Sequence, residues 1–123
     1  MAGFEFENKV KLYFGPGKIN ELGKLCKELG SKPMVVTTHS LDDEGGFGKV
    51  LNRVLSILKD SGIQPVVYDR AVLNPTTTSV DEGAGIAIDN NVDYIIGVGG
   101  GSAVDTAKAI AVGARTKRPI WDF

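Results

Sequence analysis

The chain has 123 residues, 42% of them hydrophobic and 24% charged, which is the composition of one ordinary folded domain. Fourteen basic and fifteen acidic residues leave a formal charge of −1, so the charge balance favours neither a nucleic acid nor an anionic membrane as a partner. No apolar run approaches the roughly 18 residues of a membrane span, and the start does not resemble a signal peptide, so we expect a cytoplasmic protein. One Cys and one His exclude an internal disulfide and an ordinary zinc finger.

The N-terminal residues alternate in polarity. Val10, Leu12 and Phe14 share one side of an extended chain, with lysines mostly on the other, which is the period of a half-exposed strand. Phe4 and Phe6 show the same alternation before it. We therefore expect an N-terminal edge strand or a hairpin, ended by a Gly-Pro-Gly turn.

Helical and strand patterns then alternate along the rest of the chain. Apolar residues at three- and four-residue steps predict helices over 18–30, 50–61, 79–88 and 103–114. Short apolar runs predict strands over 33–37, 63–68 and 94–98. Ser79 followed by Glu82 fits a capping box at the start of the third helix. This order predicts an α/β fold, a Rossmann-like parallel sheet flanked by helices.

Three loops follow the strands, over 38–48, 69–78 and 99–102. In a parallel sheet they all emerge at the carboxyl edge, where open α/β sheets bind their ligands. The last of them contains Gly99, Gly100 and Gly101 between a strand and a helix. Glycines let the backbone approach a bulky anion, and the amides and dipole of a helix start attract it. The motif predicts a phosphate or pyrophosphate site, with tight helix–strand packing as the alternative.

Two polar residues follow the glycines. The Ser102 hydroxyl is suited to cap the helix or to donate to a phosphate oxygen, and Asp105 three residues on completes a possible capping box. A carboxylate beside a phosphate would repel it. Asp105 therefore either satisfies backbone donors or faces a neutral part of a ligand, and the sequence leaves both roles open.

Other reactive side chains have simpler interpretations. Cys26 lies on an apolar helical stripe, which favours a small core residue over a reactive thiol. His39 is in a polar loop, where a solvated residue is favoured over a ligand contact. The pair Asp42 and Asp43 does not follow the first parallel strand as the acidic pair of a receiver domain would, so it is interpreted as solvated.

Three motifs together resemble the iron-containing (group III) alcohol dehydrogenases. They are Phe-Gly-Pro-Gly over 14–17, Leu-Asn-Pro-Thr over 73–76, and Gly-Gly-Gly-Ser-Ala-Val-Asp-Thr-Ala-Lys over 99–108. They occur in the family's order and spacing, and the resemblance covers essentially the whole chain. It implies that residues 1–123 are a dinucleotide-binding domain for NAD or NADP. An all-helical domain with Fe²⁺ or Zn²⁺, held by one Asp and three His, would follow.

The resemblance also implies roles for single residues. Gly99, Gly100, Gly101 and Ser102 would form the pyrophosphate loop, Asn74 would line the adenosine side, and Asp105 would lie toward the nicotinamide. Thr38 stands where the family often has the Asp that holds the adenosine ribose, so NADP should be tolerated. No catalytic or metal-ligating residue is expected within the chain, which alone should be inactive. Trp121 and Phe123 should be partly exposed.

The resemblance implies a small alcohol or aldehyde as substrate and a homo-oligomer, with no nucleic-acid or membrane partner. Two alternatives remain. One is a glycerol-dehydrogenase-like or dehydroquinate-synthase-like relative of the same fold, the latter binding NAD without net redox chemistry. The other is a non-catalytic α/β binding module, which the chain length alone would suit.

Overall fold

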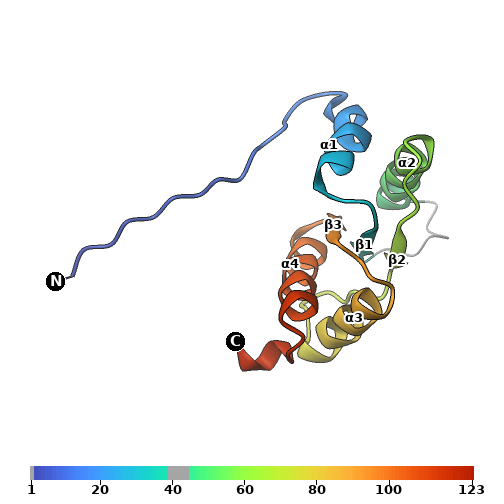
Figure 1. Ribbon diagram of the computed structural model, residues 1–123. Helices are drawn as coiled ribbons and strands as arrows, with labels where there is room; N and C mark the ends of the chain where they lie inside the picture. Colours follow the sequence, from blue (N-terminus) through green and yellow to red (C-terminus); the bar gives the residue numbers. More distant parts are fainter. Residues whose placement is uncertain (1, 39–44) are drawn as a thin grey trace.

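The computed structural model describes residues 2–38 and 45–123 and alternates helices with strands beyond residue 17 (Figure 1). In chain order the elements are η1 (Lys18–Glu21), α1 (Leu22–Leu29), β1 (Pro33–Thr37), α2 (Gly46–Asp60), β2 (Val66–Tyr68), α3 (Thr77–Asp89), β3 (Tyr94–Val98), α4 (Gly101–Thr116) and η2 (Ile120–Asp122). The predicted Rossmann-like α/β fold is therefore confirmed. No helix in these residues is long and apolar enough to cross a bilayer.

The three strands form a parallel sheet in the order β2-β1-β3. β1 is central and every one of its residues is buried, which explains its nearly continuous apolar sequence. Its register places Val36 beside Tyr68 of β2 and beside Gly97 of β3. The carboxyl ends of the strands thus lie together at one edge.

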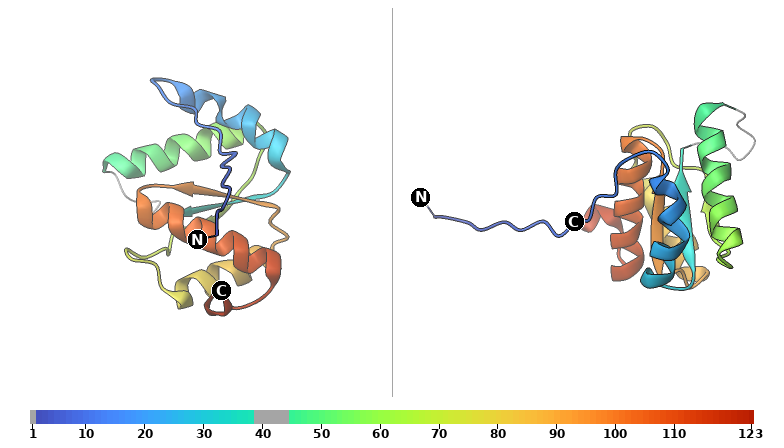
Figure 2. Two further views of the ribbon diagram at one scale, coloured as in Figure 1. Left: turned by 90° about the vertical axis from the view of Figure 1, so that its left-hand side faces the viewer. Right: turned by 90° about the horizontal axis from the view of Figure 1, so that it is seen from above.

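Helices cover both faces of this sheet (Figure 2). α1 and α2 contact each other on one face, and α3 and α4 contact each other on the opposite face. Two apolar clusters result. Met34, Val36 and Ile110 belong to the cluster under α3 and α4, whereas Val35 and Leu58 belong to the cluster under α1 and α2. Alternate residues of β1 therefore contribute to opposite clusters, as the pleat of a strand requires.

Cys26 of α1 lies in the cluster under α1 and α2 and is 2% exposed, which confirms its expected place in the core.

The structure corrects the expectation of an N-terminal edge strand. Residues 2–14 lie extended but form no strand, and they project away from the body of the molecule (Figure 1). An alternating sequence favours an extended backbone, but a strand also needs a neighbour for its N–H and C=O groups. Within residues 2–38 and 45–123, no strand of the sheet pairs with residues 2–14.

The structure also corrects the start of α3. Its N-cap is Thr76, whose hydroxyl accepts a hydrogen bond from the Ser79 amide while the Ser79 hydroxyl faces the Thr76 backbone N–H. Ser79 is therefore the third helical residue of the capping box and not its cap. The helix begins two residues earlier than expected, and Glu82 is left to pair elsewhere.

Candidate functional site

The candidate site is the part of the sheet edge formed by the carboxyl ends of the neighbouring parallel strands β1 and β3. The chain leaves β1 to form β2 on one side, then crosses back to form β3 on the other side of β1. The segments after β1 and β3 therefore depart in opposite directions, and open α/β sheets generally bind their ligands at such a point. Thr38, directly after β1, is half-buried there. His39, Asp42 and Asp43 lie outside the described residues.

The glycine loop after β3 and the first turn of α4, residues 99–102, form an open surface that we call the cradle. Gly99 has φ 141°, a backbone conformation that side chains with a Cβ rarely adopt. Gly100 is the N-cap of α4, and in the part of the chain that the structure describes a Cβ on Gly100 or Gly101 would meet no atom within 4 Å beyond its own helix and chain neighbours. The first amides of a helix have no partner within it, and the dipole makes this end positive. Space for an anion and donors for its oxygens thus coincide, so these residues fit a pyrophosphate.

Gly97, two residues before Gly99, has the opposite role. A Cβ there would lie 3.1 Å from the Ala107 Cβ and 3.3 Å from the Val104 Cα. The absence of a side chain at this position lets α4 pack closely against β3. The two interpretations of the glycine-rich sequence therefore belong to different residues, close packing to Gly97 and open space to Gly100 and Gly101.

The structure brings Asn74 and Ser102 together, 28 positions apart in sequence. The Asn74 backbone N–H donates to the Ser102 hydroxyl oxygen at 3.3 Å. Asn74 has φ 56°, a left-handed conformation that Asn tolerates better than most residues. The Thr106 hydroxyl donates to the Ser102 carbonyl oxygen at 2.7 Å, which ties this residue to the next turn of α4. The loop after β2 and the glycine loop after β3 therefore form one surface.

The capping box expected from Ser102 and Asp105 is not formed. The N-cap of α4 is Gly100, without a side-chain cap, and the Ser102 hydroxyl is turned to Asn74 instead. Asp105 is exposed one turn further along α4, with a carboxylate oxygen 3.6 Å from the Lys108 ammonium nitrogen. Its carboxylate is thus not needed to satisfy the helix amides, which removes the structural role that the sequence left open.

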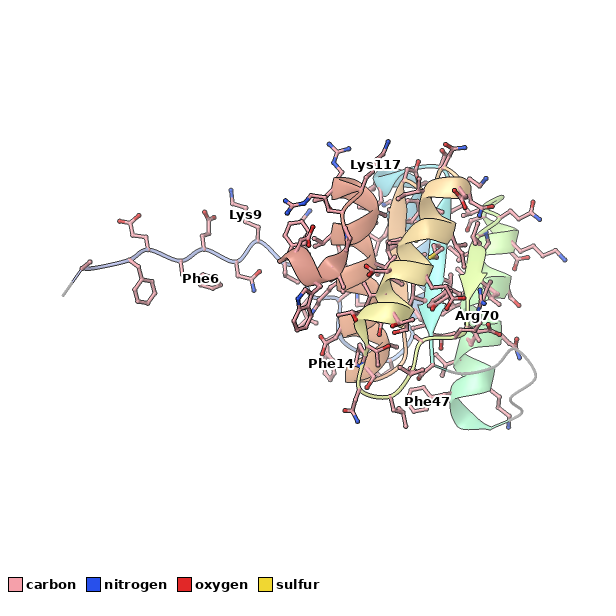
Figure 3. The ribbon with its side chains drawn as sticks, turned by 90° about the horizontal axis from the view of Figure 1, so that it is seen from below. Phe6, Lys9, Phe14, Phe47, Arg70 and Lys117 are labelled. Atoms are coloured by element: carbon pink, nitrogen blue, oxygen red, sulfur yellow. The ribbon has the colours of Figure 1, made fainter. Side chains whose placement is uncertain are left out.

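A polar network that the sequence analysis missed supports the Asn74 loop at its start. The Tyr68 hydroxyl donates to the Ser79 carbonyl oxygen at 2.8 Å and lies 3.3 Å from a Glu82 carboxylate oxygen. Glu82 also pairs with the Arg70 guanidinium at 2.5 Å, and that group stacks 5.4 Å from the Tyr68 ring centroid. Arg70 lies just after β2 (Figure 3). Burial, then the Glu82 charge, raises the pKa of Tyr68, so the phenol stays a donor. No sequence motif signals this network, because its members meet only after the chain turns.

No group of three or more His, Cys, Asp or Glu side chains in residues 2–38 and 45–123 is arranged to hold a metal ion.

Comparison with known proteins identifies the family to which this chain is similar. A family model described as iron-containing alcohol dehydrogenase matches residues 9–123. NADH-dependent butanol dehydrogenase A of Clostridium acetobutylicum is 34% identical over 123 residues, which are 100% of this chain and 31% of that protein. Lactaldehyde reductase of Escherichia coli (strain K12) is 37% identical over 101 residues, 81% of this chain and 25% of that protein.

Solved structures show the same similarity. The crystal structure of an NADH-dependent butanol dehydrogenase A from Thermotoga maritima superposes with a TM-score of 0.84 at 36% identity, over 98% of this chain and 30% of that one. A sulfoacetaldehyde reductase from Bifidobacterium kashiwanohense, solved in complex with NAD⁺, gives a TM-score of 0.78 at 26% identity, over 98% of this chain and 31% of that one. This chain therefore spans about a third of the length of these relatives.

Proposed function

The chain belongs to the iron-containing alcohol dehydrogenase family, and we propose that residues 1–123 form the dinucleotide-binding domain of an NAD(P)-dependent alcohol dehydrogenase or aldehyde reductase. The observation that carries this proposal is the cradle at the start of α4. Gly100 and Gly101 stand at the first residues of α4, and a Cβ on either would meet no atom of another described residue within 4 Å. A packing role alone would leave no such space there.

Each site residue has a part in this proposal. The amides of Gly99–Ser102 hold the pyrophosphate, and the helix dipole balances part of its charge. Asn74, joined to Ser102, lines the adenosine side of the loop. Thr38 lies at the end of β1, where the adenosine ribose is held in sheets of this type. Asp105 stands a turn away from the pyrophosphate and faces the neutral nicotinamide side. The bound nicotinamide supplies the hydride acceptor or donor.

The remaining parts of the activity are proposed from the relatives. Their names include NADH-dependent butanol dehydrogenase and lactaldehyde reductase, so we propose a small alcohol or aldehyde as substrate, NAD as the first cofactor and NADP as a tolerated one. We assign Fe²⁺ or Zn²⁺, and the residues that hold it, to the part of such enzymes beyond this domain. The domain alone would then lack the Lewis acid that stabilises the developing alkoxide, worth several kcal/mol, and should show no turnover. A homo-oligomer is also proposed.

Calorimetric titration with NADH tests the cradle. Gly100→Val or Gly101→Val should lower the affinity for NADH by at least about tenfold, because the branched side chain would occupy the place of the pyrophosphate. The valine would clash with no other side chain of the described residues, so the fold should be unaffected. Gly85→Ala is the matched control, since a Cβ at Gly85 in α3 also meets no atom within 4 Å. Unchanged NADH affinity in the valine variants, with a native circular dichroism spectrum, would contradict the proposal.

A further inference from the structure

Thr106 is a buried polar residue of α4, one turn beyond the cradle. Its exposed fraction is 0%, and its hydroxyl donates to the Ser102 carbonyl oxygen at 2.7 Å. In an α-helix that carbonyl also accepts from the backbone N–H four residues further on, which is the N–H of Thr106 itself. The hydroxyl is therefore a second donor from the same residue to one carbonyl, and the helix does not need it.

A bond of this kind normally brings a helix no advantage. Threonine hydroxyls that bond back to the carbonyl four residues earlier slightly destabilise a helix and often bend it. Thr116 forms the same bond to the Val112 carbonyl oxygen, at 2.8 Å, but at the exposed far end of α4. The two threonines thus share one local geometry and differ in what they hold. The carbonyl held by Thr106 belongs to a residue of the cradle.

Ser102 is held from two directions as a result. Thr106 holds its carbonyl oxygen, and the Asn74 backbone N–H donates to its hydroxyl oxygen at 3.3 Å. The three residues before Ser102 are glycines, which restrict the backbone less than any other residue and have no side chain to fix it. The orientation of Ser102 therefore depends on the helix turn that follows it and on the loop after β2.

Thr106 belongs to the part of α4 that is fixed against the sheet. A Cβ at Gly97 of β3 would lie 3.1 Å from the Ala107 Cβ and 3.3 Å from the Val104 Cα, so the helix approaches the strand closely at this turn. A chain of hydrogen bonds thus runs from a fixed, buried turn of α4 through Ser102 to the loop after β2.

We propose that Thr106 is a positioning residue of the pyrophosphate site, an inference that rests on the function proposed above. Its hydroxyl holds the Ser102 backbone so that the Ser102 hydroxyl oxygen accepts from Asn74 and keeps its proton for a phosphate oxygen. A serine hydroxyl has one proton to donate and two lone pairs, so it does both at once. When the Thr106 bond is removed, Ser102 turns away, and the Asn74 N–H and the phosphate lose the same partner.

Two substitutions separate the hydroxyl of Thr106 from its packing. Thr106→Val keeps the branched shape and removes the hydroxyl, whereas Thr106→Ser keeps the hydroxyl and removes a buried methyl group. A packing role makes Thr106→Ser the more harmful change, and the positioning role makes Thr106→Val the more harmful one. Thr116→Val removes the same kind of bond from the far end of α4 and is the matched control.

Amide hydrogen exchange at Asn74, followed by NMR without cofactor, tests the chain of bonds itself. Thr106→Val should speed exchange of the Asn74 N–H by at least about threefold, because the oxygen that accepts it is no longer held in place. Thr106→Ser and Thr116→Val should leave the exchange rate unchanged. An unchanged rate in Thr106→Val would overturn the proposal, whatever the affinity for NADH.

Calorimetric titration with NADH tests the consequence for binding. Thr106→Val should lower the affinity by about 3- to 10-fold, the value of one hydrogen bond, and Thr106→Ser should restore it. The loss should be smaller in a Ser102→Ala background, because Thr106 acts through the Ser102 hydroxyl. An equal loss in both backgrounds, or a greater loss in Thr106→Ser than in Thr106→Val, would overturn the proposal.

Gly100→Val in the same titration separates this inference from the function on which it rests. If Gly100→Val lowers the NADH affinity and Thr106→Val does not, the cradle binds the cofactor and Thr106 has no part in it. If neither substitution changes the affinity, the proposed function and the role of Thr106 are both wrong.

Discussion

The backbone N–H of Asn74 and the hydroxyl oxygen of Ser102 lie 3.3 Å apart and join the loop after β2 to the first turn of α4. Asn74 is in the left-handed conformation, with φ 56°. Ser102 is in the first turn of α4, directly after three glycines that have no side chains to fix the backbone. The hydrogen bond therefore links the loop after β2 to the glycine loop after β3 and restrains both.

The first prediction concerns this contact. Ser102→Ala removes the acceptor for the Asn74 amide and a donor for the proposed phosphate, each a hydrogen bond worth about 0.5–1.5 kcal/mol. Together the two bonds contribute about 1–3 kcal/mol, so NADH affinity should fall by about 5- to 150-fold. Thr116→Ala, which removes a hydroxyl bonded to Val112 at the far end of the same helix, should leave it unchanged. Calorimetric titration measures the NADH affinity of each variant. Equal affinities of Ser102→Ala and Thr116→Ala would contradict the assignment of Ser102 to the binding site.

The second prediction concerns cofactor choice at Thr38. An Asp at the end of this strand accepts hydrogen bonds from a ribose 2′-hydroxyl and repels a 2′-phosphate. Thr38 repels neither, so NADPH and NADH should bind within about tenfold of each other, and Thr38→Asp should shift that ratio at least about tenfold toward NADH. Competition between the two cofactors in one titration measures the ratio. A strong wild-type preference for NADH that Thr38→Asp leaves unchanged would show that another residue reads the ribose.

The third prediction concerns the contact between α3 and α4. A Cβ at Gly83 would lie 2.9 Å from the Ile110 Cγ1 and 3.3 Å from the Tyr68 ring. Gly83→Ala should therefore lower the free energy of unfolding by about 1–3 kcal/mol, despite the better helix propensity of Ala.

The chain offers a matched control two residues away. Gly85→Ala in the same helix meets no neighbour and should raise stability by about 0.5–1 kcal/mol. Ile110→Val, introduced together with Gly83→Ala, should recover part of the lost stability, because it removes the Ile110 Cδ1 methyl group that crowds the new Cβ. Urea unfolding of the four chains measures these changes, and a stabilising Gly83→Ala would contradict the close approach of the helices.

The fourth prediction concerns Tyr94 and alkaline pH. Its hydroxyl is buried beside the Cys26 thiol, a weak hydrogen-bonding group, and no stronger partner reaches it among the described residues. Burial, with a contribution from Cys26, raises the pKa of Tyr94 from 10.0 to about 12. Between these values the unfolded chain has released the proton and the folded chain retains it. The free energy of unfolding contributed by this group therefore falls as pH rises from 10 to 12.

Tyr94→Phe removes that titration. The variant should lose less stability than the wild type from pH 10 to 12, and its stability at pH 7 should change little because a poorly satisfied buried hydroxyl is removed. Tyr13→Phe, at an N-terminal residue that is 45% exposed, should keep the wild-type pH dependence. Urea unfolding at each pH measures the slopes, and parallel slopes for Tyr94→Phe and the wild type would contradict the assignment.

The sequence by itself determined the α/β alternation and the position of the glycine loop. Both are local properties. The strand of Pro33–Thr37 shows as a short apolar run because it is buried on both faces, and the later helices show as three- and four-residue apolar steps because each buries one side. Three glycines between a strand and a helix likewise specify a backbone conformation without reference to the rest of the chain.

Only the tertiary structure decided which residues meet. Asn74 reaches Ser102, and Arg70 reaches Glu82, because the crossover from β2 to β3 brings their segments to one edge of the sheet. The tertiary structure also decided which glycine has which role: Gly97 packs against α4, whereas Gly100 faces open space. The N-terminal alternation predicted an extended backbone correctly and a sheet edge incorrectly, because local polarity favours a conformation whereas strand pairing depends on a neighbour elsewhere in space.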